Sequence, residues 1–414
     1  AAAGRSPRTT QASAPADGNS MASQSLDNYG LTQSETDYLG ITTLYTWDAA
    51  RRLKLSETRA ASRPEAQTTQ TQWHPTYRLP VLVTEAGRST AYTYDANGNK
   101  LSETVTNLQS GQARTWAWTY GGRGVVTSLT EPGGAVWSYT NGALGLPTRA
   151  VNPLGHETRY QYDDAGRVTR IAQDGLAVQT FEHDARGQLV MHKRGADTTR
   201  YTWTVTGQLQ GVTGADGYAV NYGYDAAQRL IAAADNRGNS VAYTLDGLGN
   251  KIREETKDAS GAIAQLTART IDTLNRVTAV QGAAGQTQIG YDANGEAIIQ
   301  TDALNQTTRQ TLDGLKRPTA TTFADNTAAQ QTWNQLDQLT QVTDPKGVAT
   351  VYTYNAFGEV LSETSPDAGT IHYERDANGR VIKQTDARGV VTLITRDALG
   401  RPTQISRGAN HQTA

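Results

Sequence analysis

Aspartate is the residue of this sequence that could most readily do chemistry, because it recurs beside asparagine and glycine in short runs such as Asp95-Ala96-Asn97-Gly98-Asn99. Clustered carboxylates serve in proteins as calcium ligands or as pairs of catalytic acid and base. A calcium loop needs acidic or amide residues at alternate positions and a bidentate glutamate farther on, which this run does not supply. No spacing singles out one pair among the many equivalent aspartates. The sequence therefore predicts structural turns and neither a catalytic nor a metal-binding carboxylate site.

The other candidates for chemistry are the histidines and one glycine-rich run. The histidines show no HExxH or other ligand spacing, so a zinc site is not expected. The run Gly121-Gly122-Arg123-Gly124 has no following helix and no Gly-Lys-Ser/Thr, so it does not predict a phosphate loop. We expect no cofactor, no metal and no catalytic residue in this chain. The six histidines are His74, His156, His183, His192, His372 and His411.

The elements that position these residues are repeats. The motif Tyr92-Thr93-Tyr94-Asp95-Ala96-Asn97-Gly98 recurs about every 21 residues, and we call its Asp, or the residue that replaces it, the anchor. The 17 anchors define 16 intervals, of which eleven are 21 residues, two are 20 and three are 26. A fixed period of this size indicates stacked supersecondary units. The anchors are Asp48, His74, Asp95, Gly121, Gly142, Asp163, Asp184, Thr204, Asp225, Asp246, Asp272, Asp292, Asp313, Asn334, Asn355, Asp376 and Asp397.

Each unit is predicted to be a β-hairpin. Residues on both sides of the anchor alternate in polarity, which is typical of strands. Asp at the first turn position accepts a backbone hydrogen bond from two residues on, and Gly at the fourth position supplies the positive φ of a bulged turn. A second turn signal lies between anchors, as in Thr385-Asp386-Ala387-Arg388-Gly389. The predicted structural turn residues are Asp95, Gly98, Asp163, Gly166, Asp184, Gly187, Asp246, Gly249, Asp292, Gly295, Asp376, Gly379, Asp397 and Gly400.

Aromatic residues stand one and three places before many anchors and therefore share one face of their strand. We expect them to form ladders across strands. The chain has 19 Tyr but only 3 Phe, and a ring with a hydroxyl suits a sheet face that meets water. The predicted wall aromatics are Tyr92, Tyr94, Tyr160, Tyr162, Tyr201, Trp203, Tyr222, Tyr224, Tyr352 and Tyr354.

These units predict an all-β fold of antiparallel hairpins. Seventeen hairpins give on the order of 34 strands, and an open sheet of that size is expected to curl or spiral. Barrels of roughly 16 to 18 strands already enclose a water-filled space. We therefore expect a spiral sheet that curls into a hollow shell or part of one.

Composition limits the function classes. The formal charge is −2 with Lys and Arg dispersed, so nucleic acid is not an expected partner. The chain contains no run of 18 apolar residues and no Sec signal, so stable membrane insertion is not expected. The absence of Cys fits synthesis in a reducing cytoplasm.

The organisation along the chain follows from where the period holds. Residues 1–40 are rich in Ala, Ser, Thr, Gln and Gly and are predicted to be an irregular linker. Residues 41–408 form the repeat segment, and 409–414 are a tail. A repeat array normally has distinct capping units, so we expect this chain to be a fragment of a longer polypeptide.

The repeat resembles the YD repeat of the bacterial Rhs proteins. The closest local match is Tyr160-Gln161-Tyr162-Asp163-Asp164-Ala165-Gly166-Arg167-Val168, and the resemblance extends from about residue 41 to about residue 408. It implies a spiral sheet wound into a cage that holds a variable C-terminal toxin, often delivered by type VI secretion. The family also includes the C component of insecticidal ABC toxins, wall-associated contact toxins and the YD shell of teneurins. Family members that cleave themselves carry Asp-Pro-x-Gly-Leu, which Asp344-Pro345-Lys346-Gly347-Val348 matches only in part, so we interpret this run as an ordinary turn.

The resemblance leads to a structural function, in which the chain is a shell segment and the catalytic toxin domain lies elsewhere in the polypeptide. The expected partners are that toxin cargo and the remaining shell repeats, with a secretion spike and a chaperone. The protein is expected to be made in the bacterial cytoplasm and exported for interbacterial competition without a Sec signal in this chain. The first alternative is a cell-surface adhesion or carbohydrate-binding module. The second, an enzyme built from loops of the array, is disfavoured because the connections are short.

Overall fold

The computed structural model describes residues 8–13 and 21–408. Thirty-seven strands form one antiparallel sheet in these residues, and the only helical element there is a three-residue 3-10 turn, η1 (Gly122–Gly124). The predicted all-β hairpin fold is confirmed, with a few more strands than expected. The first strand, β1 (Arg8–Ser13), pairs only with β2, and the last, β37, pairs only with β36, so the sheet is open.

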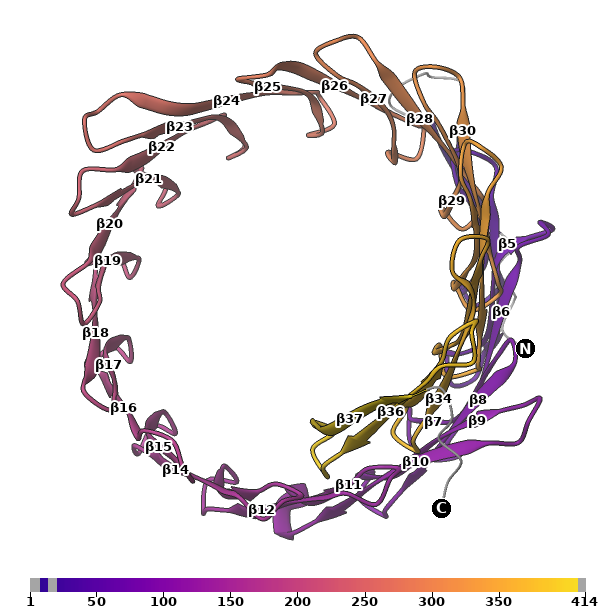
Figure 1. Ribbon diagram of the computed structural model, residues 1–414, viewed down its shortest axis with the longest axis horizontal. Coiled ribbons are helices and arrows are strands. Elements are labelled where there is room, and N and C mark those ends of the chain that lie inside the picture. Colours follow the sequence, from indigo (N-terminus) through magenta and orange to yellow (C-terminus); the bar gives the residue numbers. More distant parts are fainter. Residues whose placement is uncertain (1–7, 14–20, 409–414) are drawn as a thin grey trace. The chain divides into compact units, whose positions relative to one another are not determined.

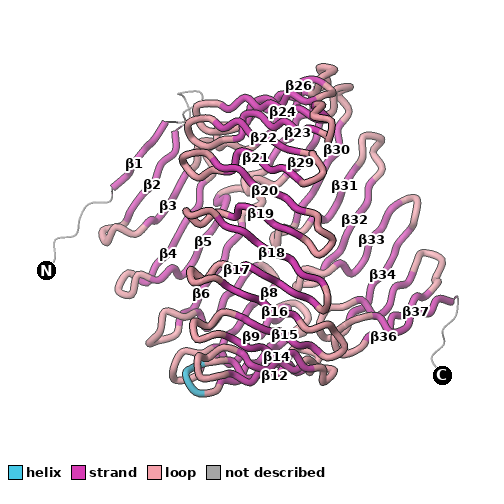
Figure 2. The backbone as a smooth tube through the Cα atoms, turned by 90° about the vertical axis from the view of Figure 1, so that its left-hand side faces the viewer, coloured by secondary structure: helices cyan, strands magenta, loops and turns pink. Residues whose placement is uncertain are grey.

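The described residues divide into two compact units. Unit 1 contains the chain up to Trp137, Tyr291–Ile298 and the chain from Thr308 onward, and unit 2 contains Ser138–Gly290 and Ile299–Thr307. Figure 2 shows the strands of unit 2 stacked side by side, with their turns along two opposite edges. In Figure 1, the labels β14 to β25 follow one another in chain order.

The strands of the first segment of unit 1 pair in chain order. They are β2 (Met21–Leu26), β3 (Thr32–Thr36), β4 (Thr42–Asp48), β5 (Leu53–Ala61), β6 (Gln67–Trp73), β7 (Pro80–Glu85), β8 (Arg88–Tyr94), β9 (Lys100–Asn107), β10 (Ala113–Tyr120) and β11 (Val126–Thr130).

The strands of unit 2 repeat the same antiparallel pairing. They are β12 (Val136–Asn141), which begins in unit 1, β13 (Pro147–Val151), β14 (Glu157–Tyr162), β15 (Val168–Gln173), β16 (Gln179–His183), β17 (Leu189–Arg194), β18 (Asp197–Trp203), β19 (Leu209–Thr213), β20 (Ala219–Tyr224), β21 (Leu230–Asp235), β22 (Ser240–Leu245), β23 (Lys251–Lys257), β24 (Ile263–Ile271), β25 (Val277–Gly282) and β26 (Gly285–Tyr291).

The remaining strands, apart from β27 and the start of β28, belong to the second segment of unit 1. They are β27 (Ala297–Thr301), β28 (Thr307–Leu312), β29 (Pro318–Thr322), β30 (Ala328–Trp333), β31 (Leu339–Thr343), β32 (Ala349–Tyr354), β33 (Val360–Ser365), β34 (Gly369–Arg375), β35 (Val381–Thr385), β36 (Val391–Arg396) and β37 (Pro402–Gly408).

Most hairpins bend at the same place. The register between the two strands shifts at the residue before the anchor, for example between Thr93 and Tyr94 and between Gln161 and Tyr162. Such a bulge increases the local twist of a sheet. In the 26-residue intervals the extra residues lengthen strands as well as connections, since β5 and β24 have nine residues each.

The sheet is one layer thick in packing terms. The chain exposes 24447 Å², compared with roughly 15,600 Å² for a compact monomer of its mass. Only six hydrophobic side chains of the described residues are buried, and no large side chain among them is fully buried. The strand residues are mostly half-buried or exposed in alternation. The strands are therefore held by backbone pairing and by contacts along each face, without a second packed layer.

The prediction of an irregular linker over residues 1–40 is wrong for residues 8–13, which form β1, and for residues 21–40, which contain β2 and β3. The cause is a repeat that the sequence analysis missed: Asp27 lies 21 residues before Asp48, and Gly30 occupies the fourth turn position with φ 74°. The backbone N–H groups of Tyr29 and Leu31 both donate to the Asp27 carboxylate at 2.8 Å. The linker prediction for residues 1–7 and 14–20, and the tail at 409–414, lie outside the described residues.

Candidate functional site

The anchor turn is a closed set of hydrogen bonds around one carboxylate. Asp95 Oδ1 accepts the N–H groups of Asn97 at 2.9 Å and Asn99 at 2.8 Å. The Asp95 N–H donates to the Asn99 carbonyl at 3.0 Å, and the Gly98 N–H donates to the Asp95 carbonyl at 3.1 Å. Asp satisfies amides that would otherwise be left unpaired at the tip of the hairpin.

The residue after the turn glycine completes this set. Arg167 Nε donates to Asp163 Oδ2 at 2.6 Å, and Asn99 Nδ2 donates to Asp95 Oδ2 at 2.7 Å. Hydrogen bonds to the charged form stabilise it. Those from the Arg167 backbone and side chain lower the pKa of Asp163, and those from Asn99 lower the pKa of Asp95. The same direction applies to Asp225, Asp235, Asp246, Asp258, Asp272, Asp325, Asp386 and Asp397.

The structure places every predicted turn residue in such a turn, and these residues are distributed over separate hairpins and do not converge on one pocket. The predicted glycines have φ between 78° and 93°. In each pair the glycine N–H donates a hydrogen bond to the Asp carbonyl. The pairs are Asp95 with Gly98, Asp163 with Gly166, Asp184 with Gly187, Asp246 with Gly249, Asp292 with Gly295, Asp376 with Gly379 and Asp397 with Gly400.

The aromatic residue immediately before the anchor has a role that sequence reasoning missed. Its polar atom donates to a backbone carbonyl of the preceding hairpin, 14 or 15 residues upstream, so Tyr162 Oη bonds the Pro147 carbonyl at 2.8 Å. Burial raises the pKa of Tyr162, which keeps its hydroxyl protonated as a donor. This bond explains why Tyr is common and Phe rare. The same link is made by Tyr94, Trp203, Tyr224, Trp333 and Tyr354, and by the guanidinium groups of Arg375 and Arg396.

The aromatic residues that were predicted to form ladders across strands have non-aromatic residues opposite them on the neighbouring strand. The residue opposite Tyr160 is Ile171, the residue opposite Tyr222 is Ala233 and the residue opposite Tyr352 is Glu363. Among the described residues, the predicted wall aromatics make one ring contact, an edge contact of Tyr94 with His74 at 6.4 Å. The next aromatic pair lies two strands away, beyond ring contact, because strands are about 4.8 Å apart. All ten predicted wall aromatics, namely Tyr92, Tyr94, Tyr160, Tyr162, Tyr201, Trp203, Tyr222, Tyr224, Tyr352 and Tyr354, are half-buried.

The opposite face of the sheet is lined with hydroxyl groups, and we call it the hydroxyl face. The residue two places before the anchor is Thr in eleven of the 17 units and is never a large apolar residue. Thr93 pairs its hydroxyl with Ser102 at 2.6 Å, and Thr353 pairs with Ser362 at 2.7 Å. Such cross-strand pairs stabilise the sheet without apolar contact. The face therefore meets solvent or a polar partner without requiring cover.

A seam joins the part of unit 1 that ends at Trp137 to the two later parts, which begin at Tyr291 and Thr308. We define it as the contacts of the turns within residues 37–135 with the anchor turns within residues 292–380. At its centre, Arg114 Nη1 and Nη2 donate to Glu359 Oε1 and Oε2 at 2.7 and 2.9 Å. The Arg114 guanidinium carbon lies 3.9 Å from the centre of the Phe357 ring. Burial disfavours the charged form of Glu359, but the hydrogen bonds from Arg114 and Asn355 outweigh it and lower the pKa of Glu359.

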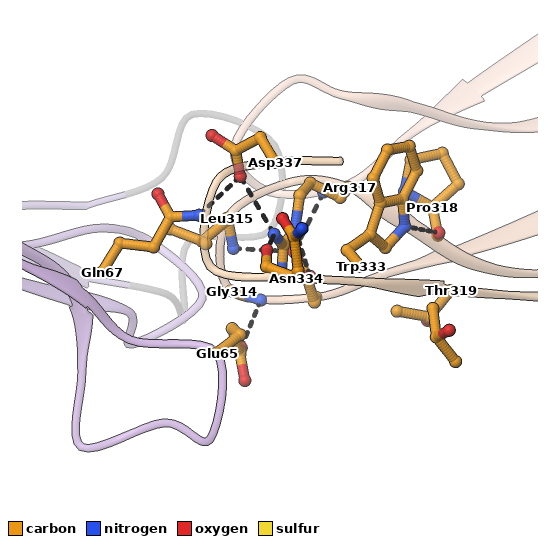
Figure 3. A network of polar contacts seen from close by, with 12 residues as sticks. Glu65, Gln67, Gly314, Leu315, Arg317, Pro318, Thr319, Trp333, Asn334 and Asp337 are labelled. Carbon is orange, nitrogen blue, oxygen red and sulfur yellow. Dashed lines mark hydrogen bonds and ion pairs between the residues drawn. The ribbon is translucent and has the colours of Figure 1, made fainter. Parts of the chain in front are cut away.

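A second part of the seam, shown in Figure 3, surrounds Asp337 and Gly314. Gln67 Nε2 donates to Asp337 Oδ1 at 2.6 Å, and the Gly314 N–H donates to Glu65 Oε1 at 2.7 Å. A Cβ at Gly314 would lie 2.7 Å from that same oxygen, so a larger residue there would displace the Glu65 carboxylate. Burial opposes ionisation of Asp337, yet hydrogen bonds from Gln67 and Arg59 lower its pKa. Sequence reasoning missed the seam, because its partners are about 250 residues apart.

The two outer parts of the seam use asparagine side chains. Asn294 accepts the Tyr38 N–H at 3.1 Å and donates to Asp37 at 2.8 Å. Asn378 accepts the Gly133 N–H at 2.8 Å. These contacts join a side chain to a backbone amide or to another side chain, with no strand ladder across the seam among the described pairings. The seam is thus chemically different from the rest of the sheet.

A cavity at the seam has a volume of about 550 Å³. It is lined by Glu35 and Asp37 from one segment, Lys316 and Leu315 from the other, and Arg59. Tyr45 donates to Glu35 at 3.1 Å, and burial with this contact raises the pKa of Tyr45 to about 12. Charged groups that line the cavity bond neighbours outside it: Lys316 pairs with Glu296 at 2.7 Å, and Arg59 pairs with Asp337 at 3.1 Å. It has the character of a gap between turns and not of a catalytic pocket.

The remaining sequence candidates lie in ordinary connections. Gly121-Gly122-Arg123-Gly124 connects β10 and β11. Asp344 accepts the N–H groups of Lys346 and Val348 at 2.8 Å, as an anchor Asp does. Within the described residues, no group of three or more His, Asp or Glu side chains is placed to hold a metal ion. No helix in those residues has the length and apolarity to cross a membrane.

The fold and its turns define a class of β-hairpin repeat proteins, and comparison with known families names it. The Teneurin YD-shell profile matches residues 100–247, and the RHS Repeat profile matches residues 333–370 and 375–412. The chain therefore belongs to the Rhs/YD-repeat proteins. No curated protein is significantly similar to it in sequence.

Solved structures share the fold. A crystal structure of TcdB2-TccC3 without its hypervariable C-terminal region matches 93% of this chain with a TM-score of 0.72 at 12% identity, over 24% of its own length. TcdB2-TccC3-TEV matches 94% of this chain with a TM-score of 0.55, and TcdB2-TccC3-Cdc42 matches 96% with 0.54, both at 12% identity and over 30% of their length. The chain thus spans between a quarter and a third of the structures that it resembles.

Proposed function

We propose that this chain is a wall segment of a shell that encloses a toxin cargo carried by the same polypeptide. The observation that carries the proposal is the single-layer Rhs/YD sheet with one hydroxyl face. Its fold is shared with a TcdB2-TccC3 structure that is described as lacking a hypervariable C-terminal region. A wall that separates a cargo from its surroundings needs a continuous hydrogen-bonded sheet but no solid core. Each unit consists of a continuous hydrogen-bonded sheet without a solid core.

The residues support a structural function for the chain. The carboxylates are used in turn hydrogen bonds, and the tyrosine hydroxyls are used in links between hairpins. The shell fold is structural, and a catalytic activity would reside in the cargo. We propose that the cargo is a C-terminal toxin, that the protein is made in a bacterial cytoplasm, and that it is exported by type VI secretion against competing bacteria.

The hydroxyl face is the surface that we assign to contact with cargo. Thr and Ser that already bond each other offer little apolar area to a partner, so a folded or unfolded cargo would lie against this face without a specific site. On the other face, the aromatic residues directly before the anchor are half-buried and bond the backbone of the preceding hairpin, which makes them less available to stack on sugars. This disfavours the adhesion and carbohydrate-binding alternative.

The test is protease protection in the full polypeptide that contains this chain. We expect the segment C-terminal to the repeats to resist a protease that digests the same segment when it is produced alone. Type VI delivery is tested separately, by comparing toxicity to neighbouring cells with and without a functional secretion apparatus. Equal digestion of the segment in both contexts would refute enclosure, and specific binding on a glycan array would favour the adhesion alternative.

A further inference from the structure

Charged side chains are unevenly distributed over the hydroxyl face. This face comprises the residues two and four places before an anchor and the residues opposite them, since residues paired directly across two strands lie on the same face. Among the described strands β4 to β11, the paired residues of this face are all Thr, Ser, Gln, Ala or Leu. The hydroxyl face is therefore uncharged over the first segment of unit 1.

The same face of unit 2 carries a row of cations from β13 to β18. Arg170 and Lys193 lie on either side of Thr180, one on each neighbouring strand, so their backbones are roughly 10 Å apart. Arg200 follows on β18, two residues from the residue opposite Lys193. At the other end of the row, Arg149 lies opposite Arg159. We call Arg149, Arg159, Arg170, Lys193 and Arg200 the basic strip.

The Arg149 end of the strip is partly neutralised within the sheet. Two like charges directly opposite each other destabilise a sheet, and Glu157 lies between them. Glu157 accepts a hydrogen bond from Arg149 and another from Arg159 Nε at 2.9 Å. These bonds lower the pKa of Glu157 to about 2, so the carboxylate stays charged. The Glu157 N–H in turn donates to Asp174 at 2.8 Å.

The rest of the strip has an excess of positive charge. Arg170 is half-buried, and Lys193 and Arg200 are exposed. None of the ion pairs among the described residues includes these three cations. The carboxylate nearest to them in the strand register is that of Glu182, which is exposed two residues after Thr180. Three cations beside one carboxylate can each accept a further anionic partner.

We propose that the basic strip binds an extended acidic segment of the cargo polypeptide, rich in Asp or Glu. Complementary charge gives such a contact its selectivity. An extended chain presents every second side chain to the same side, about 6.8 Å apart, so alternate carboxylates can reach successive cations of the strip. Thr180, Thr198 and Gln161 lie between the cations and can hydrogen-bond the backbone of the segment.

The surroundings of the strip favour a peptide over a nucleic acid. Single-stranded nucleic acids are bound where aromatic rings that stack on bases accompany the positive charge. The aromatic residues of these strands, such as Tyr160 and Tyr201, are paired with Ile171 and Val212 on the opposite face of the sheet. The proposal rests on the proposed function for the source of the segment. It refines that function, because it gives the face assigned to the cargo a preference for negative charge.

The experiment is fluorescence anisotropy of this chain with a labelled peptide of alternating Glu and Thr. A peptide of about eight residues spans about 27 Å when extended, compared with about 24 Å for the five strand spacings from β13 to β18. We expect saturable binding that weakens as the ionic strength rises, because salt screens exposed charges. A peptide of alternating Lys and Thr and a single-stranded oligothymidine of equal length are the comparison probes.

A triple variant tests the residues. Arg170→Gln, Lys193→Gln and Arg200→Gln together are expected to lower the affinity for the acidic peptide about tenfold, as the loss of three exposed ion pairs would. The matched control combines Arg388→Gln, Arg401→Gln and Arg407→Gln, which change the net charge equally. Their side chains are 75%, 62% and 64% exposed and lie outside the strip. Equal melting temperatures of both variants and wild type show that the fold is retained.

Four results would overturn the inference: no binding of the acidic peptide to wild type, equal binding to the strip variant, an equal loss in the control variant, or tighter binding of oligothymidine than of the peptide. Peptide binding is measured on this chain without a cargo. Its failure would therefore leave enclosure, which protease protection measures, intact. Conversely, a cargo that is digested in the full polypeptide would refute enclosure even if the strip binds the acidic peptide.

Discussion

Replacing Arg114 by methionine is expected to release the seam while leaving the hairpins paired. Arg114 is 7% exposed and binds Glu359, which is 18% exposed, through two hydrogen bonds. Removing one partner of a buried ion pair leaves an uncompensated charge, and the cost is about 3 kcal/mol. Since about 1.4 kcal/mol corresponds to a factor of ten, the open population of the seam should rise by about a hundredfold.

The assay is amide hydrogen exchange at two reporters. The Gly133 N–H donates to Asn378 across the seam, and the Gly314 N–H donates to Glu65. Both should exchange about a hundredfold faster in Arg114→Met if opening is cooperative. Amides within strands, such as those of β14 and β15, should keep their protection.

Two variants make the result interpretable. Arg114→Met combined with Glu359→Gln removes the stranded charge and should recover much of the lost protection, as a double-mutant cycle measures. Arg401→Met is the matched control, because Arg401 is 62% exposed and its pair with Asp397 should contribute little. Unchanged exchange at Gly133 and Gly314 in Arg114→Met would refute the view that this ion pair holds the seam.

Three further predictions concern the repeat itself. Tyr162→Phe removes the hydroxyl bond to the preceding hairpin and should lower the free energy of unfolding by about 1 kcal/mol in denaturant titration. Tyr160 makes no such bond in the structure, so Tyr160→Phe should change the free energy of unfolding little. Gln228 has φ 65° at a position that glycine usually occupies. Gln228→Gly should raise the free energy of unfolding by about 0.5 kcal/mol, because it relieves about 1 to 2 kcal/mol of backbone strain, which exceeds the entropic cost of glycine. Acid should unfold the sheet: the pKa values of Asp95 and Asp163 are lowered in the folded state, so their stabilisation is complete above the ordinary Asp pKa of 3.8 and is lost as pH falls through the folded values. A circular dichroism titration that shows no loss of stability below pH 3.8 would contradict this last prediction.

The hairpins could be predicted from the sequence because each depends on neighbours. Asp163 and Gly166 make their turn within four residues, so the motif contains the whole determinant. The same local signal at Asp27 and Gly30 was available but was hidden by the polar composition around it. Strand β2 reads Met21-Ala22-Ser23-Gln24-Ser25-Leu26, which resembles a linker by composition although its turn is of the anchor kind.

The links between hairpins and the seam could not be predicted. The Tyr162 bond to Pro147 depends on the register of the intervening strands, which the bulge changes by one residue. Arg114 and Glu359 are ordinary charged residues in the sequence, and only the three-dimensional structure brings them together. The second residue after the anchor is Leu336 in a turn at the seam and Leu248 in an exposed turn. The sequence around this residue has the same character in both turns. What differs is the neighbouring segment, which no local pattern encodes.

The seam also makes the protein sensitive to how many residues it contains. Arg114 with Glu359 and Gly133 with Asn378 are both 245 residues apart. Insertion of one whole repeat into unit 2 would preserve every hairpin and every face. It would, however, place each turn of residues 37–135 opposite a different anchor turn from the one that it contacts now. The seam contacts therefore constrain the number of residues between them. An insertion or deletion that the sheet itself tolerates would remove these contacts.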